Sequence, residues 1–243
     1  MLQLLRSLVF SLGYWLSIVF YGLLSLPLLL LPRAFAAKII ISWNQCVLSW
    51  LRITCGVKTS ISGLGLEAIP ATCVIVANHQ SPWETFFFQY HLYPLSTILK
   101  KELLRIPFFG WGLRIMDPIA IDRSTPVQAL KQIKKISLAR LANNRRIIIF
   151  PEGTRMPLGH IGTYKRSAAD IAKEAGVPLI PIAHTAGQHW LNKHLLKKPG
   201  KIKVHIGEAI DMTDKNTKEV MQAIEAWTKK TLAEVESAQS TSA

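Results

Sequence analysis

The chain contains a short apolar run that leads directly into polar residues, Val74-Ile75-Val76-Ala77-Asn78-His79-Gln80-Ser81-Pro82-Trp83-Glu84. The apolar run is typical of a strand. Ser81-Pro82 is typical of a helix start, because serine is favoured at the N-cap and proline at the first helical position. A strand that passes through a short loop into a helix is a building block of parallel α/β sheets. The run therefore predicts an α/β fold in which His79 lies at the carboxyl end of a strand.

After Gly63 the sequence alternates between short apolar runs and helical stretches, which predicts a mostly parallel central sheet flanked by helices. The expected strands are residues 73–77, 119–121, 146–150, 179–183 and 201–207. The expected helices are residues 82–89, 126–142, 167–175 and 217–236. A chain of 243 residues can bury one sizeable core. We therefore expect one catalytic domain, residues 59–236, between N-terminal membrane-associated helices, residues 1–58, and a flexible tail, residues 237–243.

The N-terminal region is apolar enough to enter a membrane. No charged residue occurs between Ser7 and Pro32, and this segment as an α-helix would extend about 39 Å, longer than the bilayer core of about 30 Å. Pro27 is expected to kink or end this helix. A second apolar segment, residues 35–53, follows at once. We expect a helical hairpin that either spans the bilayer or dips into one leaflet.

Basic residues indicate the orientation of this hairpin. Arg33, Lys38, Arg52 and Lys58 follow the first segment, whereas Arg6 alone precedes it, so the positive-inside rule places the catalytic domain on the cytoplasmic side. In a bacterium this would be the inner membrane. The tripeptide 34–36 also has the A-x-A form of a secretory cleavage site. The first segment is, however, longer than the apolar core of about 7 to 15 residues found in such signals.

Composition narrows the possible partners. The chain has 29 basic and 15 acidic residues, a net charge of +14, which attracts nucleic acid, anionic lipid or an acidic carrier protein. Its 49% hydrophobic residues and mean hydropathy of +0.24 favour a membrane lipid, and no nucleic-acid-binding motif is recognisable. Three cysteines without C-x-x-C spacing and histidines without an H-E-x-x-H pattern predict neither a disulfide framework nor a metal site.

The first candidate site pairs His79 with Glu84. Ligands bind at the carboxyl ends of strands in open α/β sheets, and Glu84 lies one turn inside the following helix. Its carboxylate could hold Nδ1 of His79 and leave Nε2 to accept a proton. Glu84 could instead complete a capping box with Ser81, in which it accepts only the backbone N–H of Ser81. The two roles are compatible, and we interpret the pair as a general base and its supporting carboxylate.

A second candidate site follows the apolar run 147–149, with the sequence Phe150-Pro151-Glu152-Gly153-Thr154-Arg155. Gly153 lets the backbone turn toward an anion, Thr154 offers a hydroxyl, and Arg155 can form paired hydrogen bonds to a phosphate. An ordinary Pro-Gly turn is the simpler reading of the same residues. Arg123, which follows the strand 119–121, supplies a second guanidinium, and Lys101 could bind an anion as well.

Together these motifs resemble the glycerolipid acyltransferase family, in particular the 1-acylglycerol-3-phosphate acyltransferases. Two further blocks agree with this family, residues 112–123 and residues 177–182, so the resemblance covers about residues 74–183. It implies transfer of a fatty acyl group from acyl-CoA or acyl-carrier protein to the sn-2 hydroxyl of a lysophospholipid acceptor, giving phosphatidic acid. The thioester is then a substrate, and no cofactor is expected. His79 would be the base, with Glu84 as its partner.

The resemblance also implies roles for the second site and shows two departures. Arg123 and Arg155 would hold the phosphate, with Gly153, Thr154 and Lys101 nearby, and Glu152 would bond the glycerol or position Arg155. The family pattern is H-x-x-x-x-D, so Glu84 is longer by one methylene and must fold back to reach His79. The segment 164–167 replaces a Phe-Lys-Lys-Gly run. These departures leave open another lysolipid acceptor, such as lyso-ornithine lipid or lysophosphatidylcholine. A non-catalytic membrane-binding protein with the same fold is a separate alternative, against which the intact His79 and Arg155 argue.

Overall fold

The computed structural model describes the backbone of residues 1–240 and the side chains of residues 1–235. Its centre is a seven-stranded sheet with the strand order β1-β7-β6-β2-β5-β3-β4. The strands are β1 Val57–Gly63, β2 Val74–Ala77, β3 Leu95–Lys100, β4 Ile119–Ile121, β5 Arg146–Ile149, β6 Leu179–His184 and β7 Gly200–Ile206. Every neighbouring pair is parallel except β6 and β7. The expected mostly parallel sheet flanked by helices is confirmed.

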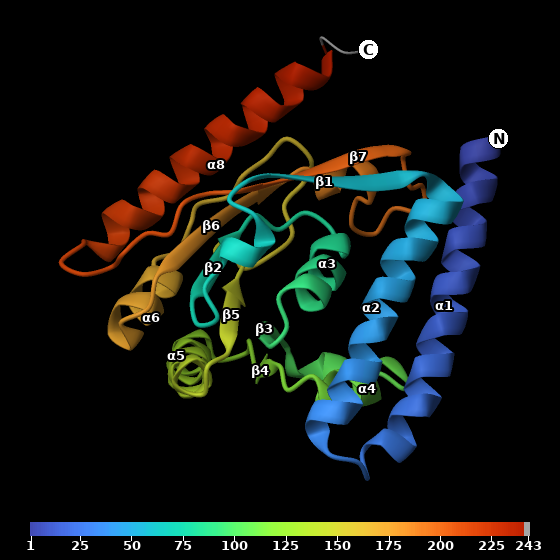
Figure 1. The fold of residues 1–243 in the computed structure, drawn as a ribbon, viewed down its shortest axis with the longest axis horizontal. Helices are drawn as coiled ribbons and strands as arrows, with labels where there is room; N and C mark the ends of the chain where they lie inside the picture. The colour runs from blue at the N-terminus through green and yellow to red at the C-terminus, as the bar shows by residue number, and fades with distance from the viewer. Residues whose placement is uncertain (241–243) are drawn as a thin grey trace.

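Helices cover both faces of this sheet (Figure 1). Their bounds are α1 Leu2–Leu28, α2 Arg33–Cys55, α3 Trp83–His91, α4 Phe109–Ile115, α5 Pro126–Ala142, α6 Ser167–Ala175, α7 Ala186–His189 and α8 Thr217–Ser240. Alternate residues of β2 point to opposite faces: Ile75 packs in a core with α1, α2 and α3, whereas Val74 and Val76 pack in a core with α5, α6 and α8. A strand buried on both faces must be apolar throughout, which is why β2 reads as a continuous run.

The two N-terminal helices are long and apolar enough to cross a membrane. Large apolar side chains are exposed along α1, among them Leu12, Trp15, Leu16 and Phe20, and such a face is stable only against lipid or another apolar surface. This arrangement indicates a membrane-associated hairpin. Helix α1 ends at Leu28, one residue after Pro27, as expected for a helix-terminating proline.

The hairpin also packs tightly on the catalytic part. Phe10 of α1 is buried and meets the ring of Trp190 edge-on at 5.0 Å. Trp43 of α2 meets Phe86 of α3 edge-on at 5.4 Å. These aromatic residues belong to the same core as one face of the sheet. The helices and the sheet therefore share one hydrophobic interior. The expected boundary at residue 58 falls inside β1, Val57–Gly63.

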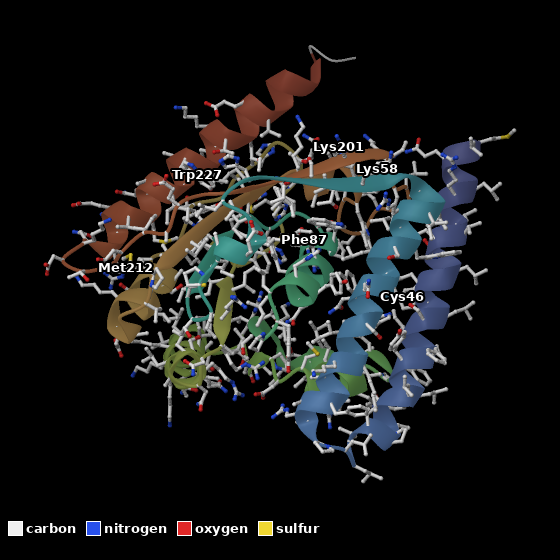
Figure 2. The ribbon with its side chains drawn as sticks, viewed as in Figure 1. Cys46, Lys58, Phe87, Lys201, Met212 and Trp227 are labelled. Atoms are coloured by element: carbon white, nitrogen blue, oxygen red, sulfur yellow. The ribbon has the colours of Figure 1, made fainter. Side chains whose placement is uncertain are left out.

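Two strands were not expected from the sequence. β1 forms an edge of the sheet and pairs only with β7 within the described part of the chain, so most of its residues are exposed and polar. Figure 2 shows Lys58 and Lys201 on these paired strands at the periphery, whereas Phe87 lies in the interior. β3 contains the buried polar residues Ser96 and Thr97, which interrupt the apolar pattern. Both strands form because neighbouring strands supply their backbone partners.

The C-terminal helix continues to Ser240, beyond the expected end at residue 236. The expected tail, residues 237–243, therefore overlaps the end of α8, and residues 241–243 lie outside the described residues. The flexibility of the tail stays a prediction.

Close packing of the hairpin gives a test of its role in stability. A Cβ atom added at Gly22 of α1 would lie 2.4 Å from Cβ and 2.5 Å from Cα of Phe108. Because backbone cannot give way easily, we expect Gly22→Ala to lower the free energy of unfolding by about 1–3 kcal/mol. Thermal unfolding in detergent measures this change. Leu23→Ala, at the neighbouring exposed position, is the control, and an unchanged melting temperature for Gly22→Ala would contradict the packing.

Candidate active site

The candidate residues gather at one edge of the sheet because β2, β3, β4, β5 and β6 run parallel. His79 follows β2, Arg123 follows β4, and the segment 150–155 follows β5. Carboxyl ends of parallel strands open onto the same edge. The expected convergence of three strand ends is therefore observed.

His79 and Glu84 form the centre of this edge. Nδ1 of His79 lies 2.7 Å from Oε1 of Glu84, and the Glu84 side chain is fully buried whereas that of His79 is 16% exposed. The imidazole also stacks on the ring of Phe150 at 4.2 Å between centroids. Because Nδ1 is held by the carboxylate, Nε2 is left as the nitrogen that can accept a proton. The pair thus has the geometry of a general base with a supporting acid.

The carboxylate of Glu84 also caps its own helix. The same Oε1 accepts the backbone N–H groups of Gln80 at 3.0 Å and Ser81 at 2.9 Å. The hydroxyl oxygen of Ser81 accepts the N–H of Trp83 at 3.1 Å. This is a capping box with one additional contact to an imidazole. The side chain folds back toward the loop, as a glutamate at this position must, and the structural and chemical roles coincide.

Glu152 fixes the loop that carries the base. Its Oε2 accepts the backbone N–H of His79 at 2.7 Å, and its Oε1 accepts the N–H of Gly162 at 3.3 Å. Nearby, the backbone N–H of Met156 donates to the carbonyl oxygen of His79 at 2.7 Å. Burial raises the pKa of Glu152 to about 7, against the opposing effect of the two N–H donors. Both carboxylate oxygens of Glu152 therefore accept backbone N–H groups, one from the loop after β2 and one from the loop after β5.

Arg155 lies close to this base. Its Nη1 donates to Oδ1 of Asn192 at 3.4 Å, while its buried Nε has no hydrogen-bond partner among the described residues. Burial lowers the pKa of Arg155, and the negative charge of Glu84 acts in the opposite direction. An unpaired guanidinium nitrogen in a buried site is free to donate to an anionic ligand.

The other expected residues occupy the rim. Nη1 of Arg123 donates to the carbonyl oxygen of Gly153 at 3.0 Å, and Gly153 adopts a positive φ of 73° that favours glycine. Arg123, Gly153 and Thr154 line a cavity that opens beside His79. Lys101 instead forms an ion pair with Asp122, and hydrogen bonds from Lys101 and Ser124 hold the pKa of Asp122 well below its usual range. The neighbouring Lys100 lines the cavity.

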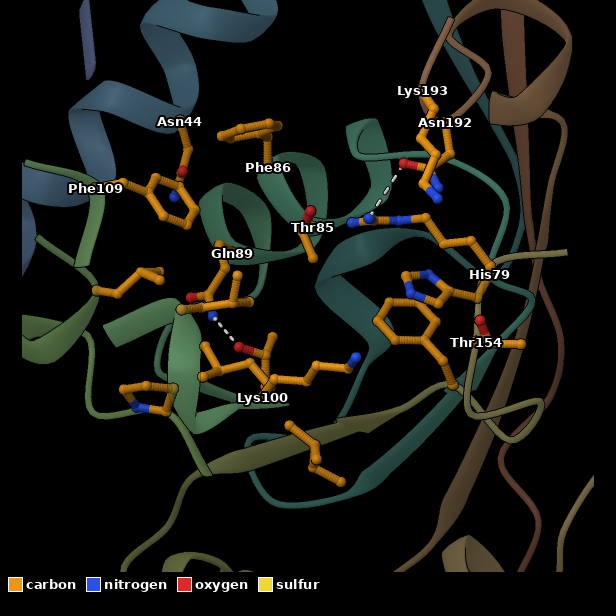
Figure 3. A pocket seen from close by; sticks show the side chains of 18 of the residues that line it. Asn44, His79, Thr85, Phe86, Gln89, Lys100, Phe109, Thr154, Asn192 and Lys193 are labelled. Carbon is orange, nitrogen blue, oxygen red and sulfur yellow. Dashed lines mark hydrogen bonds between the residues drawn. The ribbon is translucent and has the colours of Figure 1, made fainter. Parts of the chain in front are cut away.

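A cavity of about 740 Å³ opens beside His79. Figure 3 shows Asn44, Phe86 and Phe109 at one end, and His79, Asn192 and Lys193 at the other, with Lys100 extending from β3 toward His79. One end is thus largely apolar and the other is cationic. Volumes of about 300 to 1,000 Å³ are typical of small-molecule sites. The cavity suits an amphipathic ligand with an anionic group.

Several lining residues were not expected from the sequence. Trp43 and Asn44 come from α2, which the sequence assigns to the membrane hairpin, and Asn192 and Lys193 come from the connection after α7. None of them belongs to a local motif. Polar residues in an apolar helix, such as Asn44, were the signal available, because they are costly in a purely lipid-facing segment.

Comparison with known proteins agrees with this geometry. The family model described as Acyltransferase matches residues 61–185, which contain all the expected site residues. A 1-acyl-sn-glycerol-3-phosphate acyltransferase of Pseudomonas aeruginosa is 41% identical over 96% of this chain and 92% of its own length. The chain belongs to the acyltransferase family.

Further relatives extend the comparison of this acyltransferase. A 1-acyl-sn-glycerol-3-phosphate acyltransferase of Cocos nucifera is 31% identical over 66% of this chain and 53% of its own length. The crystal structure of the 1-acyl-sn-glycerophosphate (LPA) acyltransferase, PlsC, from Thermotoga maritima superposes with a TM-score of 0.78 at 27% identity, covering 96% of both chains. The likeness therefore includes the N-terminal helices as well as the sheet.

The raised pKa of Glu152 makes the stability of the acyltransferase dependent on pH. The folded protein holds this proton to about pH 7, whereas the unfolded chain loses it near pH 4.3. The free energy of unfolding therefore falls as the pH rises through this window. Glu152→Gln, which keeps an accepting oxygen for His79, is expected to lack this contribution. Melting temperatures in detergent from pH 5 to 8 measure it, and parallel curves for the two proteins would contradict the assignment.

Proposed function

We propose that this acyltransferase moves a fatty acyl group from a thioester to the sn-2 hydroxyl of 1-acylglycerol-3-phosphate, which yields phosphatidic acid for phospholipid synthesis. The observation that carries the proposal is the His79–Glu84 pair at the cationic end of a cavity whose other end is apolar. The relatives from Pseudomonas aeruginosa and Thermotoga maritima, which are acyltransferases of 1-acylglycerol-3-phosphate, support the same acceptor.

His79 acts as the general base. Its Nε2 takes the proton from the acceptor hydroxyl while the hydroxyl oxygen attacks the thioester carbonyl carbon. The C–S bond then breaks, and the imidazolium returns the proton to the departing sulfur. Glu84 holds the ring through Nδ1 and stabilises the positive charge that forms on it. The acyl group passes directly between the substrates, since Cys73 is fully buried within the sheet core and no serine nucleophile motif is present.

Two arginines bind the phosphate of the acceptor in this proposal. Arg155 contributes the unpaired buried Nε, and Arg123 lies at the rim with its Nη1 on Gly153. Thr154 and the backbone at Gly153 line the same end of the cavity. The net charge of +14 also suits the donor, because coenzyme A and acyl-carrier protein are both anionic.

The N-terminal hairpin brings this site to its lipid substrate. Helix α2 supplies Ile40, Trp43 and Asn44 to the cavity wall, so an acceptor in the bilayer lies next to the cavity. The basic residues that follow α1 support a catalytic part on the cytoplasmic side.

A panel of lysolipids with a labelled acyl thioester tests the acceptor. Purified enzyme is expected to convert 1-acylglycerol-3-phosphate fastest. If lyso-ornithine lipid or lysophosphatidylcholine is converted faster, the proposed acceptor is wrong but the acyl-transfer chemistry stands. Absence of transfer to any acceptor would refute the proposed function.

The base assignment predicts the behaviour of His79→Ala. Because general-base catalysis contributes about 10² to 10⁴ in rate, kcat is expected to fall by that order, while membrane association stays intact. Steady-state kinetics and flotation with vesicles measure the two properties. His91→Ala, at the other end of the helix that carries Glu84, is the control. A kcat like that of the wild type in folded His79→Ala would remove the assignment.

The phosphate assignment predicts a selective effect of Arg155→Ala. A hydrogen bond to a charged group contributes about 1.5–3 kcal/mol, so KM for 1-acylglycerol-3-phosphate should rise about 10-fold or more. KM for 1-acylglycerol, which lacks the phosphate, should change little. Arg166→Ala, which removes an exposed arginine paired with Asp170, serves as the control. Equal losses with both acceptors would contradict phosphate binding.

A further inference from the structure

His184 is a buried histidine next to the active site that the proposed mechanism does not use. It ends β6, beside β2, and its side chain is fully buried. Its ring lies 6.3 Å from the ring of Trp83 and 6.0 Å from that of Phe88, both of helix α3. A polar ring enclosed by aromatic residues requires partners for its nitrogens.

Those partners fix the loop that precedes the base. Nε2 of His184 lies 2.7 Å from the carbonyl oxygen of Asn78. The Asn78 amide in turn donates to the carbonyl oxygen of His184 at 3.0 Å and accepts its backbone N–H at 2.9 Å. Three hydrogen bonds thus join His184 to the residue directly before His79. They hold the end of β2 against the end of β6.

The hydrogen bonds also define the proton on the ring. Nδ1 of His184 accepts the N–H of Ala186 at 3.4 Å, so Nε2 carries the hydrogen that is donated to Asn78. Burial lowers the pKa of His184, with the charge of Glu84 acting in the opposite direction. The ring is therefore a neutral donor whose N–H dipole is oriented by the backbone.

The second carboxylate oxygen of Glu84 lies near the same ring nitrogen of His184. Oε2 of Glu84 is buried without a hydrogen-bond partner among the described residues, and Nε2 of His184 lies 3.8 Å from it. Oε1, by contrast, has all of its donors on the side of His79. Besides the imidazoles of His79 and His184, the ionisable groups that interact with Glu84 are Arg155 and Glu152. A buried carboxylate oxygen without a donor is costly, and the Nε2 edge of the His184 ring lies beside it.

We infer that His184 is a positioning residue for the His79–Glu84 pair: its Nε2–H holds the peptide before His79, and the Nε2 edge of its ring lies against Oε2 of Glu84. The carboxylate thereby lies between two imidazoles, with one oxygen on the base and the other toward His184. A glutamate side chain has one more rotatable bond than an aspartate. A second contact point restricts that freedom, so the pair keeps its geometry in each turnover.

This inference rests on the proposed acyl transfer, and its consequences are kinetic. His184 is buried behind Glu84 and does not line the cavity, so it cannot bind substrate. Loss of its ring should misplace the base without weakening binding. A displacement of about 1 Å at a reacting group can cost on the order of 10² in rate. The effect should therefore fall on kcat and leave KM nearly unchanged.

The experiment compares His184→Phe, His184→Gln and His184→Asn with the wild type in steady-state acyl transfer. Phenylalanine removes both ring nitrogens. It is expected to lower kcat by about 10- to 100-fold, as loss of a residue that orients a metal ligand or a reacting group does in other enzymes. Glutamine places an amide N–H near the position of Nε2 and should recover most of the rate. Asparagine places its amide near Nδ1 and should not. His189→Phe, which removes another buried imidazole, is the matched control for loss of stability.

A double-mutant cycle with Glu84→Gln separates positioning from a general effect on the fold. If His184 acts through Glu84, His184→Phe should lower kcat by less than about threefold when Glu84 is already replaced. Melting temperatures in detergent show whether each variant is folded. If His184→Phe does not fold, the His184→Gln and His184→Asn pair carries the same comparison.

The outcomes are distinct. A kcat for folded His184→Phe within threefold of the wild type, or an equal loss in the presence and absence of the Glu84 substitution, would overturn the inference. Recovery by glutamine but not by asparagine, together with an unchanged KM, would support it. Wild-type protein without transfer activity would refute the proposed function instead. In that case, crystal structures of the wild type and His184→Asn test the positioning contact: a shifted Glu84 side chain in His184→Asn would support it, and an unchanged one would contradict it.

Discussion

The active site depends on one buried carboxylate. Glu84 is fully buried, yet its Oε1 gathers the imidazole of His79 and two backbone N–H groups at the start of α3. A buried charge is stable only when donors surround it, and a helix N-terminus supplies both free N–H groups and a favourable dipole. The interaction that begins the helix is thus the one that orients the base.

A second set of contacts holds the backbone of the base. Oε2 of Glu152 accepts the backbone N–H of His79, and the backbone N–H of Met156 donates to the carbonyl oxygen of His79. The loops after β2 and β5 are far apart in the chain but share these bonds, so changes in one motif alter the other. Site residues connected in this way do not contribute independently. Arg155, which lines the cavity, lies in the same loop after β5 as Glu152, which holds the backbone of His79.

The N-terminal hairpin takes part in the same construction. Its aromatic residues share a core with one face of the sheet, and α2 contributes part of the cavity wall. A lipid acceptor has an apolar chain that favours the bilayer and a charged head that favours water. A cavity whose wall is built from the membrane-associated helix meets both requirements, because the chain need not cross bulk water to reach the base.

The sequence alone determined the elements whose patterns are local. The apolar N-terminal segments, the continuous apolar runs of β2 and β5, and the start of α3 after Ser81-Pro82 are all set by residues close together in the chain. Parallel strands share a carboxyl edge, so the sequence also placed His79, Arg123 and Arg155 together. It left open whether Glu84 caps a helix or supports the base, and in the structure the folded-back carboxylate contacts both the backbone N–H of Ser81 and Nδ1 of His79.

Tertiary structure decided the features that depend on distant partners. The edge strand β1 and the polar strand β3 exist because β7 and β5 supply their hydrogen bonds. Lys101 binds Asp122 and leaves Lys100 to the cavity. The contacts of Asn192 with Arg155 and of His184 with Asn78 and Glu84 join residues that are 37 to 106 positions apart in the chain. No local pattern encodes such contacts, because they arise only when the strand order brings the chain segments side by side.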